Sequence, residues 1–129
     1  NVVHRLGSVS EEDLPRWMNA CDVFAMPNRD LNGDSEGFGM VFIEAAACGK
    51  PSLAGVAGGT GSAVIDGKTG IRVNGDDIRQ VAAALRLLLR DAALRQAWGT
   101  AALKRVSIDF SWERVAEKTQ ALSFQKRKS

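Results

Sequence analysis

The chain has 129 residues, of which 45% are hydrophobic and 25% are charged, and its 17 basic and 15 acidic side chains give a formal net charge of +2. These values fit one domain with a sizeable core and do not indicate nucleic acid as a partner. No apolar run is long enough to cross a membrane. Because His4 is the only histidine, we expect neither a Ser-His-Asp triad nor a zinc cluster, and no metal site is predicted.

The first predicted elements are a strand, a helix and a second strand. A strand is predicted over Val2–Leu6, and Ser10 followed by Asp13 resembles a capping box that starts a helix over Glu11–Cys21. One face of this helix should pack on a sheet, and it consists of Leu14, Trp17, Met18 and Cys21. Val23–Met26 is short and apolar, as expected of a buried parallel strand.

The rest of the chain continues the alternation of strands and helices. Strands are predicted over Pro51–Ala54 and Ile71–Val73, and a turn over Asp66–Gly70 precedes the second of them. Asp76 or Asp77 caps a long helix whose core face consists of Val81, Leu85, Leu88 and Leu89. Two more helices are predicted, over Ala92–Val106 and over Ser111–Phe124 with Ser111 as N-cap. The pattern is that of an α/β domain with a parallel sheet flanked by helices.

A glycine pair between two glutamates is the feature most informative about function. Gly37 and Gly39 lie between Glu36 and Glu44, after an apolar strand and at the opening of an Ala-rich helix. Glycines let the backbone approach a ligand, and a helix beginning near Gly39 aims unpaired N–H groups at it, which suits a phosphate. Eight helical residues span about 12 Å, so the two carboxylates could contact opposite ends of an extended ligand. Sugar hydroxyls are natural donors to such carboxylates.

These residues resemble a known motif. The segments DVFAMPN and DSEGFGMVFIEAAACGKP are similar to the donor-binding motif of the retaining glycosyltransferases of family 4, which have the GT-B fold. The resemblance extends to LGSVSEEDLPRWMNACDVF, AGVAGG, DGKTGIRV and FSWERVAEK, so it covers nearly the whole chain. It implies that Glu44 binds the ribose of a nucleotide-sugar and that Glu36 is a catalytic residue beside the transferred sugar. The main-chain segment implied to face the sugar and diphosphate consists of Gly37, Phe38, Gly39, Met40 and Val41.

The resemblance also implies the role of the whole chain. Such enzymes have two Rossmann-like domains, and residues 1–129 would be an incomplete C-terminal half of the GT-B fold, inactive in isolation. The implied reaction transfers a hexose of mannose or glucose type from a nucleoside-diphosphate sugar, with retention and without a metal or other cofactor. The acceptor, a lipid or a saccharide, would bind the missing N-terminal domain. The loop over residues 28–35 is most similar to members that use GDP-mannose to mannosylate lipids.

The two glutamates also have ordinary structural explanations. A helical glutamate is usually solvated, but Glu44 has apolar neighbours on nearly every side in the sequence, so we expect its carboxylate to need a partner. Glu36 alone could equally be a helix N-terminal charge favoured by the macrodipole. A second cluster, with Gly58 and Gly59, follows another strand, and it fails the spacing of a dinucleotide fingerprint. These two glycines either contact the donor through their N–H groups or simply make a tight turn.

Location and assembly leave several alternatives open. Cys21 and Cys48 are typical of small core residues rather than of a disulfide, which favours the cytoplasm. The basic residues Lys126, Arg127 and Lys128 are a solvated tail or a peripheral contact with anionic lipid at the inner face of the membrane. In place of an enzyme, the chain could be a non-catalytic nucleotide-sugar-binding module. It could also be a homo-oligomer that associates through an exposed strand edge.

Overall fold

The computed structural model of the protein describes residues 3–30 and 37–125, without the side chains of residues 122–125. Glu36, most of the loop over residues 28–35, Val2 and the basic residues 126–128 therefore lie outside the described residues. The elements in chain order are α1 (Leu14–Ala20), β1 (Phe24–Met26), α2 (Met40–Ala47), β2 (Ser52–Gly55), the 3₁₀ helix η1 (Gly58–Ser62), β3 (Gly70–Val73), α3 (Ile78–Arg90), α4 (Ala92–Asp109) and α5 (Trp112–Gln125).

The described strands form a parallel sheet with the order β1-β2-β3. Ala25 pairs with Leu53 in register, and Leu53 pairs with Ile71. All four residues of the central strand β2 are buried, as expected of a strand covered on both faces. The predicted α/β class with a parallel sheet is therefore confirmed, and each of these strands lies within one residue of its predicted position.

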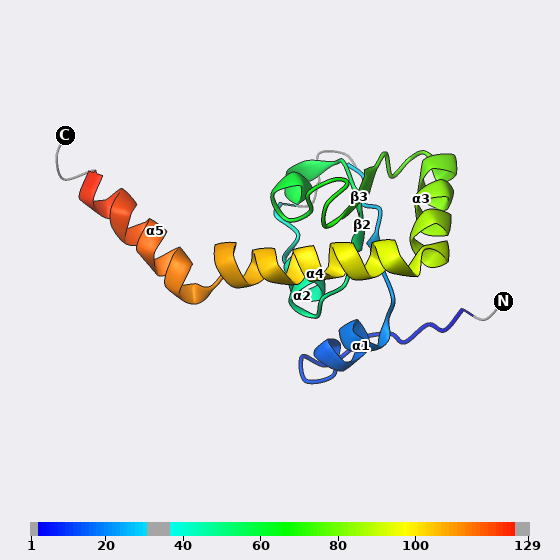
Figure 1. The fold of residues 1–129 in the computed structure, drawn as a ribbon, viewed down its shortest axis with the longest axis horizontal. Helices are drawn as coiled ribbons and strands as arrows, with labels where there is room; N and C mark the ends of the chain where they lie inside the picture. The colour runs from blue at the N-terminus through cyan, green and yellow to red at the C-terminus, as the bar shows by residue number, and fades with distance from the viewer. Residues whose placement is uncertain (1–2, 31–36, 126–129) are drawn as a thin grey trace.

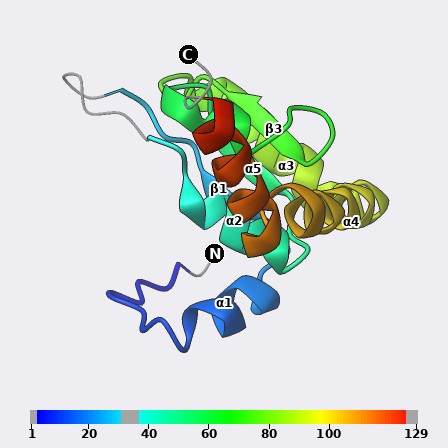
Figure 2. The same cartoon turned by 90° about the vertical axis from the view of Figure 1, so that its left-hand side faces the viewer.

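Helices cover the sheet on both faces, and the two clusters of buried side chains follow from this arrangement (Figure 1). Ala54 belongs to one cluster with Phe42 and Ile43 of α2, whereas Leu53, which points to the opposite face, packs with Leu88 of α3. Helix α4 runs past both clusters. Its C-terminal part contacts the cluster that contains Ala54, and its N-terminal part contacts the cluster that contains Leu53. Helix α5 extends away from the body of the molecule in Figure 1, and it lies in front of the other elements in Figure 2, which is viewed from that side.

Close contact between α4 and the end of α2 depends on a glycine. A Cβ atom built on Gly99 of α4 would lie 2.1 Å from the carbonyl oxygen of Gly49, a separation that no side chain tolerates. Gly49 itself follows α2 with a φ of 69° and its N–H donates to the carbonyl of Ala46. The absence of a side chain at position 99 therefore sets how closely α4 approaches the helix that carries Glu44.

The predicted strand over Val2–Leu6 is wrong for the part that is described. Residues 3–6 form no strand, and Val3 is 87% exposed. A strand needs a neighbour to pair its backbone groups and a core to cover its side chains. Among the described residues neither is present at this segment, so residues 3–6 do not form a strand.

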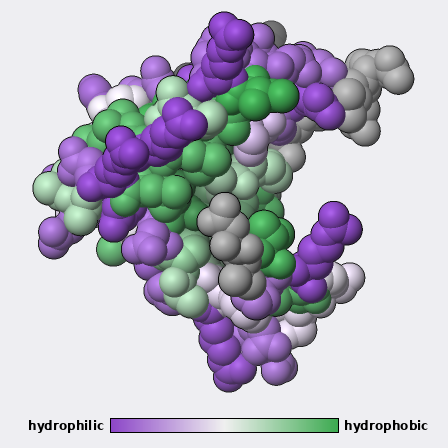
Figure 3. Space-filling view, turned by 90° about the vertical axis from the view of Figure 1, so that its right-hand side faces the viewer, coloured by the Kyte–Doolittle hydropathy of each residue, from purple (hydrophilic) through white to green (hydrophobic). Residues whose placement is uncertain are grey.

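The first helix is shorter than predicted and packs differently. It begins at Leu14 rather than Glu11, although the predicted contact between Ser10 and Asp13 exists, with the Asp13 N–H donating to Ser10 Oγ at 3.2 Å. Its main contacts are with α2, and Trp17 remains 49% exposed. Figure 3 shows a hollow in the molecular surface between the part that carries α1 and the rest. The helix therefore covers only a small area, and Met18 is its one buried residue.

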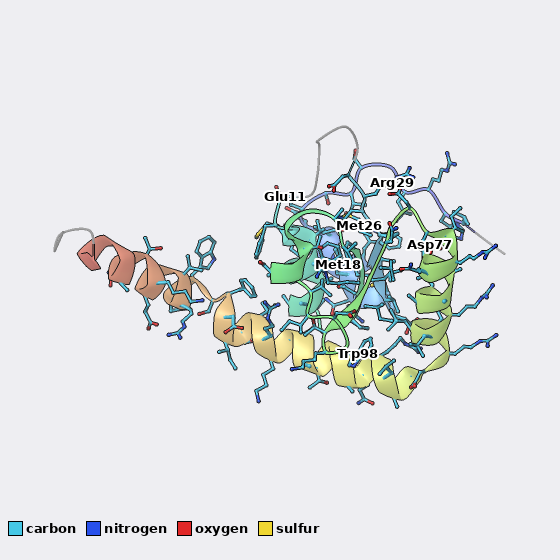
Figure 4. The ribbon with its side chains drawn as sticks, turned by 90° about the horizontal axis from the view of Figure 1, so that it is seen from above. Glu11, Met18, Met26, Arg29, Asp77 and Trp98 are labelled. Carbon is cyan, nitrogen blue, oxygen red and sulfur yellow. The ribbon has the colours of Figure 1, made fainter. Side chains whose placement is uncertain are left out.

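Helix α3 begins where the sequence predicts, at an aspartate cap. Asp77 accepts hydrogen bonds from the backbone N–H groups of Arg79 and Gln80 at 2.9 and 3.2 Å, and it lies at the start of α3 in Figure 4. Leu88 is fully buried and Val81 and Leu85 are partly buried, as predicted. Leu89 is 60% exposed, because the core face of α3 centres on Ala84 and Leu88 instead.

The Asp77 cap predicts a pH-dependent contribution to stability. The N–H groups of Gln80 and Arg79 stabilise the carboxylate and hold its pKa below the ordinary value of 3.8. A depressed pKa in the folded state gives stability that is present above pH 3.8 and is lost as pH falls through the folded value. Asp77→Ala should therefore lower the free energy of unfolding at pH 7, and the difference from wild type should narrow below pH 3.8. Urea denaturation at several pH values measures this difference, and a gap that stays constant down to pH 3 would contradict it.

Candidate functional site

The glycine motif forms a sharp turn into α2. Gly39 is the N-cap of the helix, with a φ of 78° and a ψ of 58°, a left-handed conformation that glycine adopts without strain. Its carbonyl accepts from the N–H of Phe42 at 2.9 Å. The prediction that a helix begins near Gly39 is confirmed, and Met40 and Val41 form its first turn.

The two glycine segments that the sequence marks as donor-binding lie against each other. A Cβ atom built on Gly59 would be 1.7 Å from the carbonyl oxygen of Gly37 and 3.5 Å from the Cα atom of Phe38. Gly58 precedes this contact with a φ of 66°. The segments 37–39 and 58–59 therefore meet through their backbones, just beyond the carboxyl ends of β1 and β2. In open parallel sheets this edge is where ligands bind.

Side chains that sequence reasoning missed hold the loop of residues 55–60 in place. Asn28, just after β1, accepts from the Gly55 N–H and donates to the carbonyl of Ala57, both at 3.0 Å. Thr60 is fully buried and donates to the carbonyl of Gly55 at 2.6 Å. A threonine inside a run of glycines was a signal that could have been used, since short hydroxyl side chains readily bond nearby carbonyls.

Glu44 lies in a position that differs from the prediction. Its side chain is exposed, on the helix face shared with Met40 and Ala47, whereas Phe42, Ile43, Ala45 and Ala46 point into the protein. Apolar neighbours in sequence do not surround a helical residue, because successive side chains point about 100° apart around the axis. The carboxylate is therefore available to a ligand from outside rather than held by an internal partner.

An open pocket of about 650 Å³ lies between α1 and α2, next to Glu44. Its lining is mainly apolar, with a carboxylate at Glu11 and another at Glu44. The lining residues are Glu11, Leu14, Pro15, Met18, Val41, Glu44, Ala47 and Cys48. Apolar walls with few polar groups are typical of small-molecule sites, and this volume is large enough for a nucleoside.

The cysteines lie close to this pocket. Cys21 and Cys48 are both free and partly buried. Burial raises the pKa of the Cys21 thiol, so the group is neutral at physiological pH.

In the part of the chain that the structure describes, no group of three His, Cys, Asp or Glu side chains is placed to hold a metal ion. Within that part, no helix is both long and apolar enough to span a membrane.

Comparison with known proteins gives the family. The model of the family described as "Glycosyl transferases group 1" matches residues 1–105. The chain is 39% identical over 115 residues to the GDP-mannose-dependent monoacylated alpha-(1-6)-phosphatidylinositol monomannoside mannosyltransferase of Corynebacterium glutamicum, covering 88% of this chain and 30% of that protein. It is 40% identical over 114 residues to the GDP-mannose-dependent alpha-(1-6)-phosphatidylinositol monomannoside mannosyltransferase of Mycobacterium tuberculosis, covering 87% of this chain and 30% of the relative.

Solved structures agree with this relationship. The sucrose-phosphate synthase of Thermosynechococcus elongatus superposes with a TM-score of 0.81 at 33% identity, covering 93% of this chain and 29% of that one. HepE of Anabaena in complex with UDP-glucose gives a TM-score of 0.75 at 28% identity, covering 86% of this chain and 30% of HepE. The chain thus spans about 30% of the length of these proteins. The predicted fold, a Rossmann-like and incomplete C-terminal half of a GT-B enzyme, is confirmed, and the chain belongs to the group 1 glycosyl transferases.

Proposed function

We propose that the chain is the donor-binding part of a longer retaining glycosyltransferase that transfers mannose from GDP-mannose to a lipid acceptor. The observation that carries this proposal is the meeting of the segments at Gly37 and Gly59, close to the start of the helix that presents Glu44 to an open pocket. One ligand with a nucleoside, a diphosphate and a sugar would fit such an arrangement. The names of the two mannosyltransferase relatives support the choice of donor and of a lipid acceptor.

In this proposal the pocket between α1 and α2 takes the nucleoside. The exposed Glu44 carboxylate accepts hydrogen bonds from the ribose hydroxyls, while the apolar lining packs on the base. The segment from Gly37 to Val41 and the glycines Gly58 and Gly59 contact the diphosphate and sugar through main-chain N–H groups. Glu36 lies one residue before this segment and is proposed as the carboxylate beside the transferred sugar.

The chemistry of this site is mainly electrostatic. When the bond between the anomeric carbon and the diphosphate oxygen breaks, the electron pair and the negative charge remain on the diphosphate. Main-chain N–H groups fixed by glycine turns stabilise that charge without reorganising. The positive end of the α2 helix dipole also stabilises it. The proposal includes no metal or cofactor, and the acceptor approaches from a domain that lies outside this chain.

A calorimetric titration tests the proposal. The 129-residue chain is titrated with GDP-mannose, UDP-glucose and UDP-N-acetylglucosamine, and any hydrolysis or transfer is followed on the same samples. We expect selective binding of GDP-mannose, with transfer only in the complete polypeptide. Selective binding without any turnover in the complete polypeptide would favour a non-catalytic binding module. Binding of none of the three, by this chain or by the complete polypeptide, would contradict the proposed function.

A further inference from the structure

Arg72 extends from β3 to the loop that carries Gly58 and Gly59. Its Nη2 donates to the carbonyl oxygen of Val56 at 3.2 Å and to Thr60 Oγ1 at 3.3 Å. Thr60 in turn donates to the carbonyl of Gly55, so one guanidinium reaches both ends of the turn. Within the described part of the chain, no carboxylate forms an ion pair with Arg72. The contacts of this charge are therefore with the loop.

The loop leaves room for the guanidinium at one residue. A Cβ atom built on Gly61 would lie 3.1 Å from Arg72 Nη1 and 3.3 Å from its Cζ, tighter than an ordinary van der Waals contact. No other side chain type avoids this contact, because every other residue carries a Cβ atom. Gly61 and Arg72 thus fit each other, although they belong to different elements.

The position of Arg72 has a cost that an apolar side chain would not have. Its Nε is buried and finds no hydrogen-bond partner among the described residues. Burying a charged donor without a partner is unfavourable, whereas an aliphatic side chain would fill the same place without this penalty. The two bonds that Nη2 makes to the loop are the guanidinium contacts that offset this cost.

A second arginine holds the far end of the same loop. Arg105 of α4 donates to the carbonyl oxygens of Ser62 and Ala63 at 2.5 and 2.7 Å, and its guanidinium lies 4.9 Å from the ring centroid of Phe110. The loop is thus fixed to β3 near Val56 and Thr60 and to α4 near Ser62. Between these points, Gly58 and Gly59 lie against Gly37.

We propose that Arg72 is a positioning residue. It fixes the Val56–Ser62 loop in the position in which the N–H groups of the loop contact the donor diphosphate. The part of this inference that concerns the donor rests on the proposed function. The part that concerns the order of the loop does not. Without the guanidinium, the Val56 carbonyl and Thr60 Oγ1 both lose the donor that links them, and the N–H groups between them lose their common direction.

The test compares Arg72→Met with wild type, because methionine keeps an unbranched stem and has no donors. The matched control is Arg86→Met, which removes the same charge from the exposed surface of α3. Hydrogen exchange of peptides covering residues 56–62 should become about 10-fold faster in Arg72→Met and stay unchanged in Arg86→Met. Unchanged loop exchange in Arg72→Met would overturn the proposal, whether or not the chain binds a donor.

Ligand binding separates positioning from general damage. In Arg72→Met the affinity for GDP-mannose should fall about 10-fold. GMP lacks the second phosphate and the mannose, so its affinity should stay within about twofold of the wild-type value. An equal fall for both ligands would indicate a distorted fold and would overturn the positioning role. If wild type binds neither ligand, the proposed function fails, and the exchange measurement still decides the role of Arg72 in the loop.

A double-mutant cycle with Gly61 gives an independent check. Gly61→Ala places a methyl group against the guanidinium, so it should speed loop exchange in the wild-type background. In the Arg72→Met background the same substitution should add little, because the group that it displaces is already gone. Fully additive effects of the two substitutions would mean that Gly61 and Arg72 act separately, and the proposed fit between them would be wrong.

Discussion

The Glu44→Ala variant should lose most of its affinity for a nucleotide-sugar while it keeps its fold. Hydrogen bonds to a charged group contribute about 1.5–3 kcal/mol, so we expect the dissociation constant to rise by about 10- to 150-fold. The side chain is exposed on α2 and alanine is a strong helix former, so the free energy of unfolding should change by less than about 0.5 kcal/mol. Calorimetric titration and urea denaturation on the same preparations measure both quantities.

Two variants make this expectation specific. Glu44→Gln keeps an acceptor oxygen but loses the charge, so its affinity should lie between wild type and Glu44→Ala. Glu12→Ala removes an exposed glutamate that does not line the pocket, and it should bind the donor as wild type does. If the donor affinity were unchanged in Glu44→Ala, the assignment of Glu44 to the ribose would be wrong.

Replacing Gly59 by alanine should damage both the fold and donor binding. The added Cβ atom would lie 1.7 Å from the carbonyl oxygen of Gly37 and 2.9 Å from its carbonyl carbon, so one of the two backbones has to move. Overpacking of this kind costs about 1–3 kcal/mol of unfolding free energy. Because the displaced segments are those proposed to contact the diphosphate, GDP-mannose binding should fall by more than about 10-fold.

The opposite member of the same contact provides the control. A Cβ atom built on Gly37 meets no atom within 4 Å, and its φ is not in the left-handed range. Gly37→Ala should therefore keep the unfolding free energy within about 0.5 kcal/mol of wild type. If Gly59→Ala were as stable as Gly37→Ala and bound the donor normally, the close approach of the two segments would not matter to the site.

Features with local causes could be predicted from the sequence. Asp77 caps α3 because its carboxylate reaches N–H groups two and three residues ahead, and this rule needs no knowledge of the fold. Gly39 at the start of α2 follows the same logic, since its left-handed φ is a property of one residue. The strands β1 and β2 are predicted by short apolar runs that end at Pro27 and Gly55.

Features that depend on distant contacts could not be predicted in this way. A strand is predicted over Val2–Leu6, but no element of the described chain pairs with residues 3–6. The exposure of Glu44 depends on which face of α2 meets the sheet, which the list of its sequence neighbours does not contain. Arg105 donates a hydrogen bond to a carbonyl 42 residues away in the sequence, and Arg72 donates one to a carbonyl 16 residues away. Neither contact leaves a local pattern in the sequence.

The placement of α4 has a consequence for how the protein unfolds. Its two ends belong to different buried clusters, one on each face of the sheet, and Gly99 brings its middle against the end of α2. Loss of the whole of α4 exposes side chains of both clusters at once, so this helix couples the opening of the two layers. The two faces of the sheet should therefore unfold in one cooperative step, and Arg105 links the glycine loop to the same event.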